Sequence, residues 1–132
     1  MQIVADLSTE DGIKDLVNQI PQINGCVSNA GIVGLTPIQF VTTKKIEEMQ
    51  QINLMAPVLL IKQILKQKKF QSQASIVFTS SVAGVYRVSM GNAIYSITNV
   101  ALMHICAHRL WNLPQRVLDV IVLILQWLKL EF

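Results

Sequence analysis

Hydrophobic residues recur along this chain in two alternating spacings. Short apolar runs alternate with longer segments in which apolar residues return every three or four positions. The first spacing is typical of buried strands and the second of amphipathic helices. The pattern predicts strands at 2–7, 26–31 and 74–81, and helices at 11–20, 43–68 and 93–110.

Alternation of strand and helix is typical of a parallel sheet with right-handed crossovers. The segment 74–81, ASIVFTSS, is apolar over most of its length, as expected for a strand inside such a sheet. The first helix has N-cap residue types, Ser8 and Thr9, followed by acidic residues that suit a first helical turn. The sequence therefore predicts an α/β fold.

Composition narrows the class of protein. The chain has 132 residues, of which 52% are hydrophobic and 14% charged, so we expect one folded domain and exclude a disordered chain. The net charge of +3 is small, and the lysines of 62–69 lack interleaved aromatic residues, so no nucleic-acid partner is expected.

The cysteines, the histidines and the apolar runs bear on the cellular location of the protein and on metal binding. Cys26 and Cys106 lack the spacing of a metal site, so we interpret them as reduced thiols of a cytoplasmic protein. His104 and His108 lie one helical turn apart but have no third ligand, so no metal is expected. The first residues do not resemble a signal peptide, and no apolar run reaches the roughly 18 residues of a membrane span.

Each predicted strand ends in small or polar residues. These are Asp6, the segment 28–31 and the pair Ser80 and Ser81. Ligands of parallel α/β sheets bind beyond the carboxyl ends of the strands, which predicts a site at this edge. Ala30 and Gly31 would allow a ligand to approach the backbone closely.

Four motifs in order resemble the signature of the short-chain dehydrogenase/reductase family. They are NAG after a strand, INLMAP on a helix, IVFTSSVAG at a strand tip, and YSIT, whose Tyr95 follows Ser81 by fourteen residues. The resemblance covers 2–107. It implies an incomplete Rossmann-type, doubly wound parallel sheet with helices on both faces. The domain would span 1–107, with an atypical tail at 108–132.

The resemblance also implies an activity. Members transfer hydride between NAD or NADP and a small carbonyl or alcohol substrate. By matching positions, Ser81 would hydrogen-bond the substrate oxygen, Tyr95 would be the general acid or base, and Asn53 would support a proton relay. The matching cofactor-binding positions are Asp6, Leu7, Asn29, Ala30, Gly31 and Tyr95.

Structural alternatives stay open for these residues. Tyr95 could be a packing residue at a helix start, and Asn53 a buried amide with its hydrogen bonds satisfied. Ser80 and Ser81 could be polar strand ends, and Asp6 a partner of the following helix N-terminus.

The chain departs from the family in two places that matter for activity. Asn99 occupies the lysine position of the YxxxK motif, so the charge that lowers the tyrosine pKa and contacts the ribose is lost. The glycine-rich TGxxxGxG turn has no counterpart, and Met1 falls at the family's third strand. We expect weakened cofactor binding and an impaired or inactive enzyme.

The tail after Ala107 fits neither family motif expected there. Codons possible for Arg116 to Phe132, read two nucleotides downstream, permit GIRCNSINPAMVETGI, which resembles the missing strand and loop. We therefore hypothesise a frameshift between about Leu102 and Arg116, which the coding DNA would test. The competing interpretation is a genuine C-terminal helix or strand at 117–132 that packs against the domain.

Two other functions stay open beside the oxidoreductase. One is a non-catalytic interaction module that associates with itself or a relative through helices 43–68 and 93–110. The other is a translated gene remnant without a role. The identity of the substrate and the choice between NAD and NADP are not predicted, because the segments that determine them are missing or altered.

Overall fold

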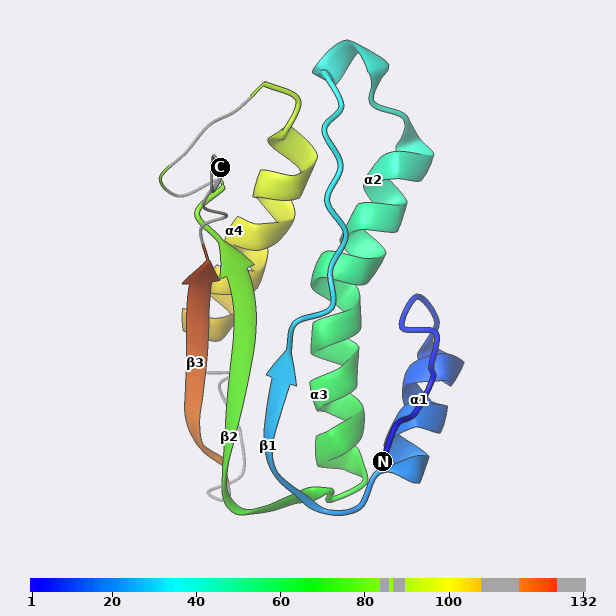
Figure 1. Ribbon diagram of the computed structural model, residues 1–132, viewed down its shortest axis with the longest axis vertical. Helices are drawn as coiled ribbons and strands as arrows, with labels where there is room; N and C mark the ends of the chain where they lie inside the picture. The colour runs from blue at the N-terminus through cyan, green and yellow to red at the C-terminus, as the bar shows by residue number, and fades with distance from the viewer. Residues whose placement is uncertain (84–85, 87–89, 108–116, 126–132) are drawn as a thin grey trace, which may run out of the picture.

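Three parallel strands form the sheet of this protein. The computed structural model describes residues 1–83, 86, 90–107 and 117–125. Strands β1 (Ile23–Ser28), β2 (Phe70–Ser81) and β3 (Val117–Leu125) lie in the order β1-β2-β3, with β2 in the centre (Figure 1). This partial parallel sheet with helices confirms the predicted α/β Rossmann-type class.

Helices connect and flank these strands. They are α1 (Glu10–Gln19), the short 3-10 helix η1 (Ile38–Phe40), α2 (Thr43–Gln50), the π-helical turn η2 (Gln51–Met55), α3 (Ala56–Lys66) and α4 (Ala93–Ala107). The segment predicted as one helix at 43–68 is therefore a single rod with a π-helical turn inside it. Residues 108–110, predicted to end the last helix, lie outside the described part of the chain.

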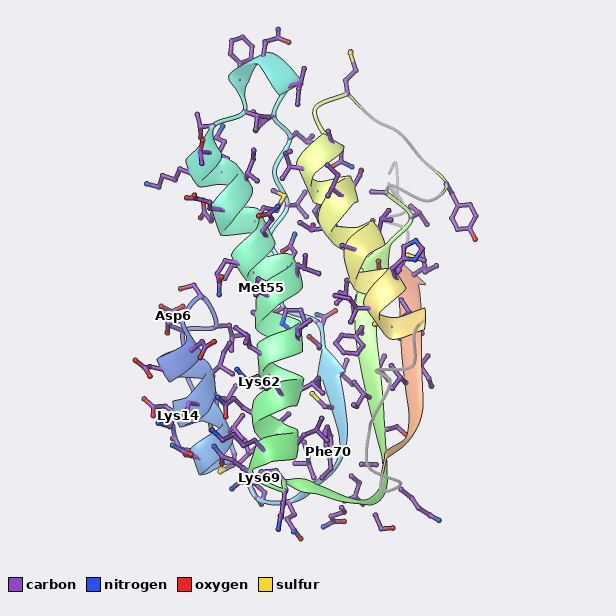
Figure 2. All side chains as sticks on the ribbon, turned by 180° about the vertical axis from the view of Figure 1, so that it is seen from behind. Asp6, Lys14, Met55, Lys62, Lys69 and Phe70 are labelled. Carbon is purple, nitrogen blue, oxygen red and sulfur yellow. The ribbon has the colours of Figure 1, made fainter. Side chains whose placement is uncertain are left out.

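The described helices all lie on one face of the sheet, whereas the sequence predicts helices on both faces (Figures 1 and 2). On β2 the side chains of Ile76 and Phe78 are buried toward the helices. On the opposite face of β3, Ile121 and Leu123 are 47% and 48% exposed. The reason is the strand order: both crossovers run in the same direction, and right-handed crossovers then place their helices on the same face.

The hydrophobic core lies between the sheet and these helices. Helix α4 packs on β2 and β3, and α3 packs on β2 and on α1. The buried cluster consists of Val17, Ile61, Ile64, Phe70, Ala74, Ile76, Phe78, Leu102 and Cys106. Because β2 supplies alternate residues to this cluster, the central strand holds the helices in place.

The first helix begins as its sequence predicts. The Thr9 hydroxyl caps α1 by accepting a hydrogen bond from the Gly12 backbone N–H at 3.0 Å. Gly12 is required at this point, because a Cβ atom there would overlap the backbone oxygen of Asp6. The N-terminal segment therefore folds back over the first turn of α1.

The strand predicted at residues 2–7 is not present in the structure. No described strand lies beside this segment, and a strand is stable only when it pairs with a neighbour. Instead, the carboxylate of Asp6 accepts hydrogen bonds from the backbone N–H and the hydroxyl of Ser8, at 2.8 and 2.6 Å. These local bonds shape a turn that leads into α1.

Strand β3 lies in the segment that the sequence analysis assigns to an atypical tail. It pairs in parallel with β2, from Ala74 opposite Val117 to Ser81 opposite Leu125. The structure thus agrees with the interpretation of a C-terminal element packed against the domain. None of the described helices is both long and apolar enough to cross a membrane.

Candidate active site

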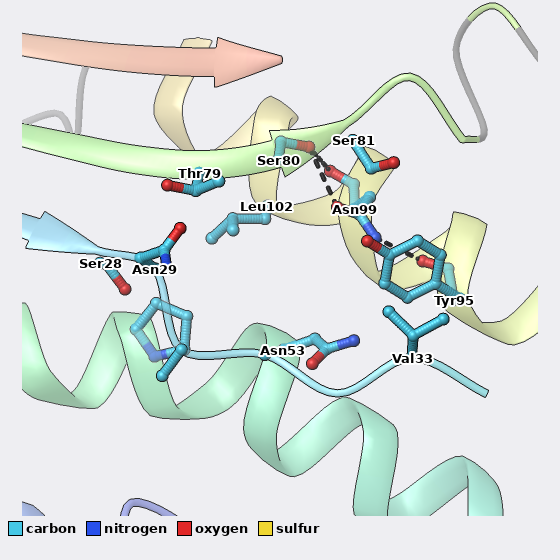
Figure 3. A pocket seen from close by; sticks show the side chains of 13 residues that line it. Ser28, Asn29, Val33, Asn53, Thr79, Ser80, Ser81, Tyr95, Asn99 and Leu102 are labelled. Carbon is cyan, nitrogen blue, oxygen red and sulfur yellow. Dashed lines mark hydrogen bonds between the residues drawn. The ribbon is translucent and has the colours of Figure 1, made fainter. Parts of the chain in front are cut away.

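A cavity of about 440 Å³ opens beyond the carboxyl ends of β1 and β2, next to η2 and α4 (Figure 3). It brings together nine of the positions singled out from the sequence, which are 28–31, Asn53, Ser80, Ser81, Tyr95 and Asn99. Its lining consists of Ser28, Asn29, Ala30, Gly31, Val33, Asn53, Pro57, Thr79, Ser80, Ser81, Tyr95, Asn99 and Leu102. The site therefore lies at the sheet edge where ligands of parallel α/β folds bind.

Ser81 and Tyr95 line the same side of this cavity. Ser81 ends β2, and Tyr95 lies in the first turn of α4 with its ring turned toward the cavity (Figure 3). The Ser81 hydroxyl oxygen accepts a hydrogen bond from the Ala83 backbone N–H at 3.2 Å, which leaves its own hydrogen available. The strand tip and the helix start thus each contribute one residue with a hydroxyl group to the lining of the cavity.

Asn53 connects the cavity to the loop after β1. Its side-chain oxygen accepts from the Ile32 N–H at 2.8 Å, and its amide nitrogen donates to the Ile32 carbonyl at 2.9 Å. The same nitrogen donates to the Thr98 hydroxyl at 3.3 Å. Asn53 lies on the π-helical turn η2, a distortion found often at functional sites. Its side chain is fully used in holding the wall of the cavity together.

Asn99 takes part in a buried bridge between β2 and α4. Its side-chain oxygen accepts from the Ser80 hydroxyl at 3.2 Å, and its amide nitrogen donates to the Tyr95 carbonyl at 2.8 Å. The Thr98 hydroxyl donates to the same carbonyl at 2.9 Å. Sequence reasoning missed this use of Ser80 and Thr98. The only signal was that both lie next to predicted site residues.

Glycine is needed at the loop that borders the cavity. A Cβ atom at Gly31 would lie 3.3 Å from the Asn53 side-chain oxygen, so even alanine would force a small shift. The close approach keeps the backbone at Ala30 and Gly31 open toward the cavity.

Asp6 and Leu7 lie apart from this cavity and do not line it. Asp6 is beside α1, on the far side of α3 from the strand tips (Figure 2). Hydrogen bonds from the side chain and the backbone of Ser8 lower the pKa of this exposed carboxyl group. The structure therefore brings the predicted cofactor positions at β1 together with the catalytic ones, and leaves these two outside.

A family model described as short chain dehydrogenase matches residues 1–123. This match covers most of the chain, including the greater part of β3. The chain belongs to the short-chain dehydrogenase family. The cavity therefore lies in a domain of this family. No curated protein sequence matches the chain.

Solved structures of short-chain dehydrogenases share the fold at low identity. One from Mycobacterium smegmatis is 18% identical, with a TM-score of 0.80 over 94% of this chain and 53% of that protein. One from Novosphingobium aromaticivorans, titled a putative short-chain dehydrogenase, is 19% identical, with a TM-score of 0.79 over 94% and 49%. One from Francisella tularensis is 22% identical, with a TM-score of 0.69 over 78% and 42%. The chain thus spans about half the length of the structures it matches.

The described residues of this short-chain dehydrogenase fit one end of a nicotinamide dinucleotide. The cavity volume suits a single small organic group, and its floor at Ala30 and Gly31 is open backbone. Asp6 and Leu7, which the resemblance assigns to the other end of the cofactor, do not line this cavity. Among the described residues, no group of three His, Cys, Asp or Glu could hold a metal ion, and His108 is outside them.

Proposed function

We propose that this cavity is an NAD- or NADP-dependent oxidoreductase site for a small carbonyl or alcohol, with impaired turnover. The observation that supports it most directly is the shared cavity of Ser81 and Tyr95, which come from different elements fourteen residues apart. Bound nicotinamide would supply or accept the hydride. Asn29, Ala30 and Gly31 would hold it at the end of β1.

The reaction places distinct demands on the two hydroxyl groups. As hydride reaches a carbonyl carbon, negative charge develops on the oxygen, and a preorganised donor stabilises it. The free hydrogen of Ser81 is suited to that task, because its oxygen is held by the Ala83 N–H. The Tyr95 hydroxyl would then deliver the proton to the same oxygen as general acid.

Impairment follows from the environment of Asn99. Among the described residues no lysine or arginine lines the cavity, so none of these residues offers a cation to Tyr95. Because the Asn99 amide is bound to Ser80 and to the Tyr95 carbonyl, it is not directed toward a ribose. We therefore expect both the chemical step and cofactor affinity to be weak.

Further elements of the proposal concern the whole chain. We propose a cytoplasmic location, supported by Cys26 and Cys106 being free thiols. Self-association through the rod α2–η2–α3 and helix α4 is proposed as well. Family membership does not favour the alternative of a purely non-catalytic module.

Steady-state reduction of a panel of aldehydes and ketones, with NADH and with NADPH, tests the function. We expect a rate close to that of the Tyr95→Phe control. We expect Asn99→Lys to raise the rate at least about tenfold above that control, because it restores a cation near the phenol. Circular dichroism of each variant would verify that it is folded.

Two results would contradict the proposal. Rapid turnover by the unaltered chain would overturn the impairment. A rate in Asn99→Lys that is unchanged by adding Tyr95→Phe or Ser81→Ala would overturn the assignment of these hydroxyl groups to the reaction.

A further inference from the structure

A second cavity lies between the loop after β1, helix α2 and the first turn of α4. Its volume is about 330 Å³, and of the described residues only Val33 lines both this cavity and the one at the strand tips. The loop rises between α2 and α4 (Figure 1). The Thr36 backbone N–H donates to the Gly91 carbonyl at 2.7 Å. This hydrogen bond ties the loop to the chain just before α4 and so joins two walls of the cavity.

Apolar side chains reach this cavity from each of its walls. They are Ile32 from the loop, Val41 just before α2, Met49 from α2 and Ile94 from α4. Met49 is buried, and the other three are half-buried. Cavities of this size that combine an apolar lining with a few polar groups are typical sites for small organic ligands. The lining therefore suits an apolar group of a ligand.

Two oppositely charged side chains of α2 line the same cavity. Lys45 and Glu48 are three positions apart, so they lie on one face of the helix. These two described residues do not form an ion pair with each other. Instead, the Lys45 ammonium donates to the Thr36 hydroxyl at 3.4 Å, and the hydrogen of that hydroxyl can donate in turn. The cavity thus offers an ammonium and a hydroxyl hydrogen at one point and a carboxylate at another.

A ligand with two opposite charges close together matches this arrangement. The carboxylate of an α-amino acid would bind Lys45 and Thr36, and its ammonium would bind Glu48. A ligand with a carboxylate alone would be repelled by Glu48, and one with an amine alone by Lys45. Because both charged side chains are exposed, each contact contributes little, and the apolar part of the ligand supplies most of the affinity.

We propose that this second cavity binds a free α-amino acid with an apolar side chain, and that Lys45 and Glu48 hold its carboxylate and its ammonium. The proposal requires neither a nicotinamide cofactor nor hydride transfer. It is therefore independent of the function proposed for the cavity at the strand tips.

Three probes separate the contributions of the two charges. L-phenylalanine carries both charged groups, 3-phenylpropionate lacks the ammonium, and 2-phenylethylamine lacks the carboxylate. Titration of the chain with each probe, followed by protein NMR chemical shifts, measures the three Kd values. We expect phenylalanine to bind at least about threefold more tightly than either singly charged probe, as expected for exposed ion pairs. The largest shifts should occur at Thr36, Met49 and Ile94.

Neighbouring residues of α2 provide matched controls. Lys45→Met and Glu48→Gln each remove one charge that lines the cavity, whereas Lys44→Met and Glu47→Gln remove the same charges from exposed side chains outside its lining. Lys45→Met should weaken phenylalanine binding at least about threefold, and Glu48→Gln should remove the advantage of phenylalanine over 3-phenylpropionate. Both controls should keep the affinities of the unaltered chain.

The proposal is overturned if phenylalanine does not bind, if 3-phenylpropionate binds as tightly, or if the controls change the affinities as much as the variants they match. Shifts confined to Ser81 and Tyr95 would also overturn it, because the probe would then occupy the other cavity. All four substitutions lie at exposed positions, so we expect each variant to fold like the unaltered chain. These outcomes are measured without turnover and can be distinguished from a failure of the oxidoreductase assay.

Discussion

At the scale of single residues, Asn53 joins three parts of the molecule that are distant in sequence. Its amide group binds both backbone groups of Ile32 and the hydroxyl of Thr98, which itself is fully buried. The resemblance indicated Asn53 as a functional residue, and buried-amide packing was the alternative. In the structure the side chain makes these three hydrogen bonds, and its part in a proton relay stays a prediction.

Replacing Asn53 with alanine should therefore destabilise the chain. Three hydrogen bonds are lost and the Ile32 groups are left without partners, so we expect the free energy of unfolding to fall by about 2 to 4 kcal/mol. Urea denaturation followed by circular dichroism measures this. Gln50→Ala, on an exposed position of the same rod, is the control and should change stability by less than about 0.5 kcal/mol. Equal midpoints for the two variants would contradict the role given to Asn53.

Cys106 makes the stability of the chain depend on alkaline pH. Burial raises the pKa of its thiol from near 9 to about 11. The unfolded chain thus loses this proton at lower pH than the folded one. The stabilisation is complete below pH 9 and is lost as pH rises toward 11, by about 2 to 3 kcal/mol in total.

Thermal or urea denaturation between pH 8 and 11 measures this loss, with Cys106→Ala as the comparison. Other groups that titrate in this range are shared by both chains, so their contributions cancel. The slope of stability against pH should be steeper in the unaltered chain. Parallel slopes would show that the Cys106 thiol is as accessible in the folded chain as in the unfolded one.

At the scale of elements, the central strand β2 carries both the core and the site. Ile76 and Phe78 are buried beneath the helices, and Ser80 and Ser81 end the same strand at the cavity. A parallel strand buried in this way was predictable from its continuous apolar run. The site residues at the strand ends were predictable for a related reason: once the strands are recognised as parallel, their carboxyl ends must meet at one edge of the sheet.

Other features of the elements could not be predicted from the sequence. The π-helical turn η2 changes the hydrogen-bonding register without changing the apolar spacing on which the helix prediction rests. Residues 2–7 have a strand-like pattern, but a pattern cannot provide the neighbour that a strand needs. The strand at 117–125 was left open, because an apolar run of this kind is compatible with either a strand or a helix.

Phe78→Ala tests the contribution of β2 to the core. Removal of this fully buried ring leaves a cavity between the sheet and the helices, and we expect a loss of about 3 to 5 kcal/mol. In a sheet of three strands, we expect that loss to remove the cooperative transition from the thermal unfolding curve measured by near-UV circular dichroism. Val27→Ala, at a side chain that is 67% exposed, should unfold like the unaltered chain. Retained cooperativity in Phe78→Ala would contradict the position assigned to the core.

At the scale of the whole molecule, the sheet has two unlike faces. One is covered by α3 and α4 (Figures 1 and 2). The other presents the exposed apolar side chains of Val27, Ile121 and Leu123. Among the described strands the order β1-β2-β3 runs in one direction, so the helices of their crossovers lie on one face. Strand number and direction, which single-sequence patterns do not encode, thus decided which faces are covered.

Exposed apolar side chains on this face should promote association of the chain as studied. We expect Leu123→Lys to reduce binding of the dye ANS and to slow aggregation on warming. The free energy of unfolding should fall by no more than about 1 kcal/mol. Met90→Lys, at an isolated exposed position, should change neither property. If both lysine variants reduce dye binding equally, the effect comes from net charge and not from the sheet face.

The buried bridge from Ser80 through Asn99 to the Tyr95 carbonyl has an evolutionary consequence. Asparagine and lysine codons differ only in their third base, so a single mutation would place a lysine at position 99. A lysine arriving there would leave the Ser80 hydroxyl without its present acceptor and would place an ammonium in a closed wall. This change is therefore genetically short, but it removes the acceptor of the Ser80 hydroxyl, so we expect the Asn99→Lys chain to be less stable even where its turnover rises.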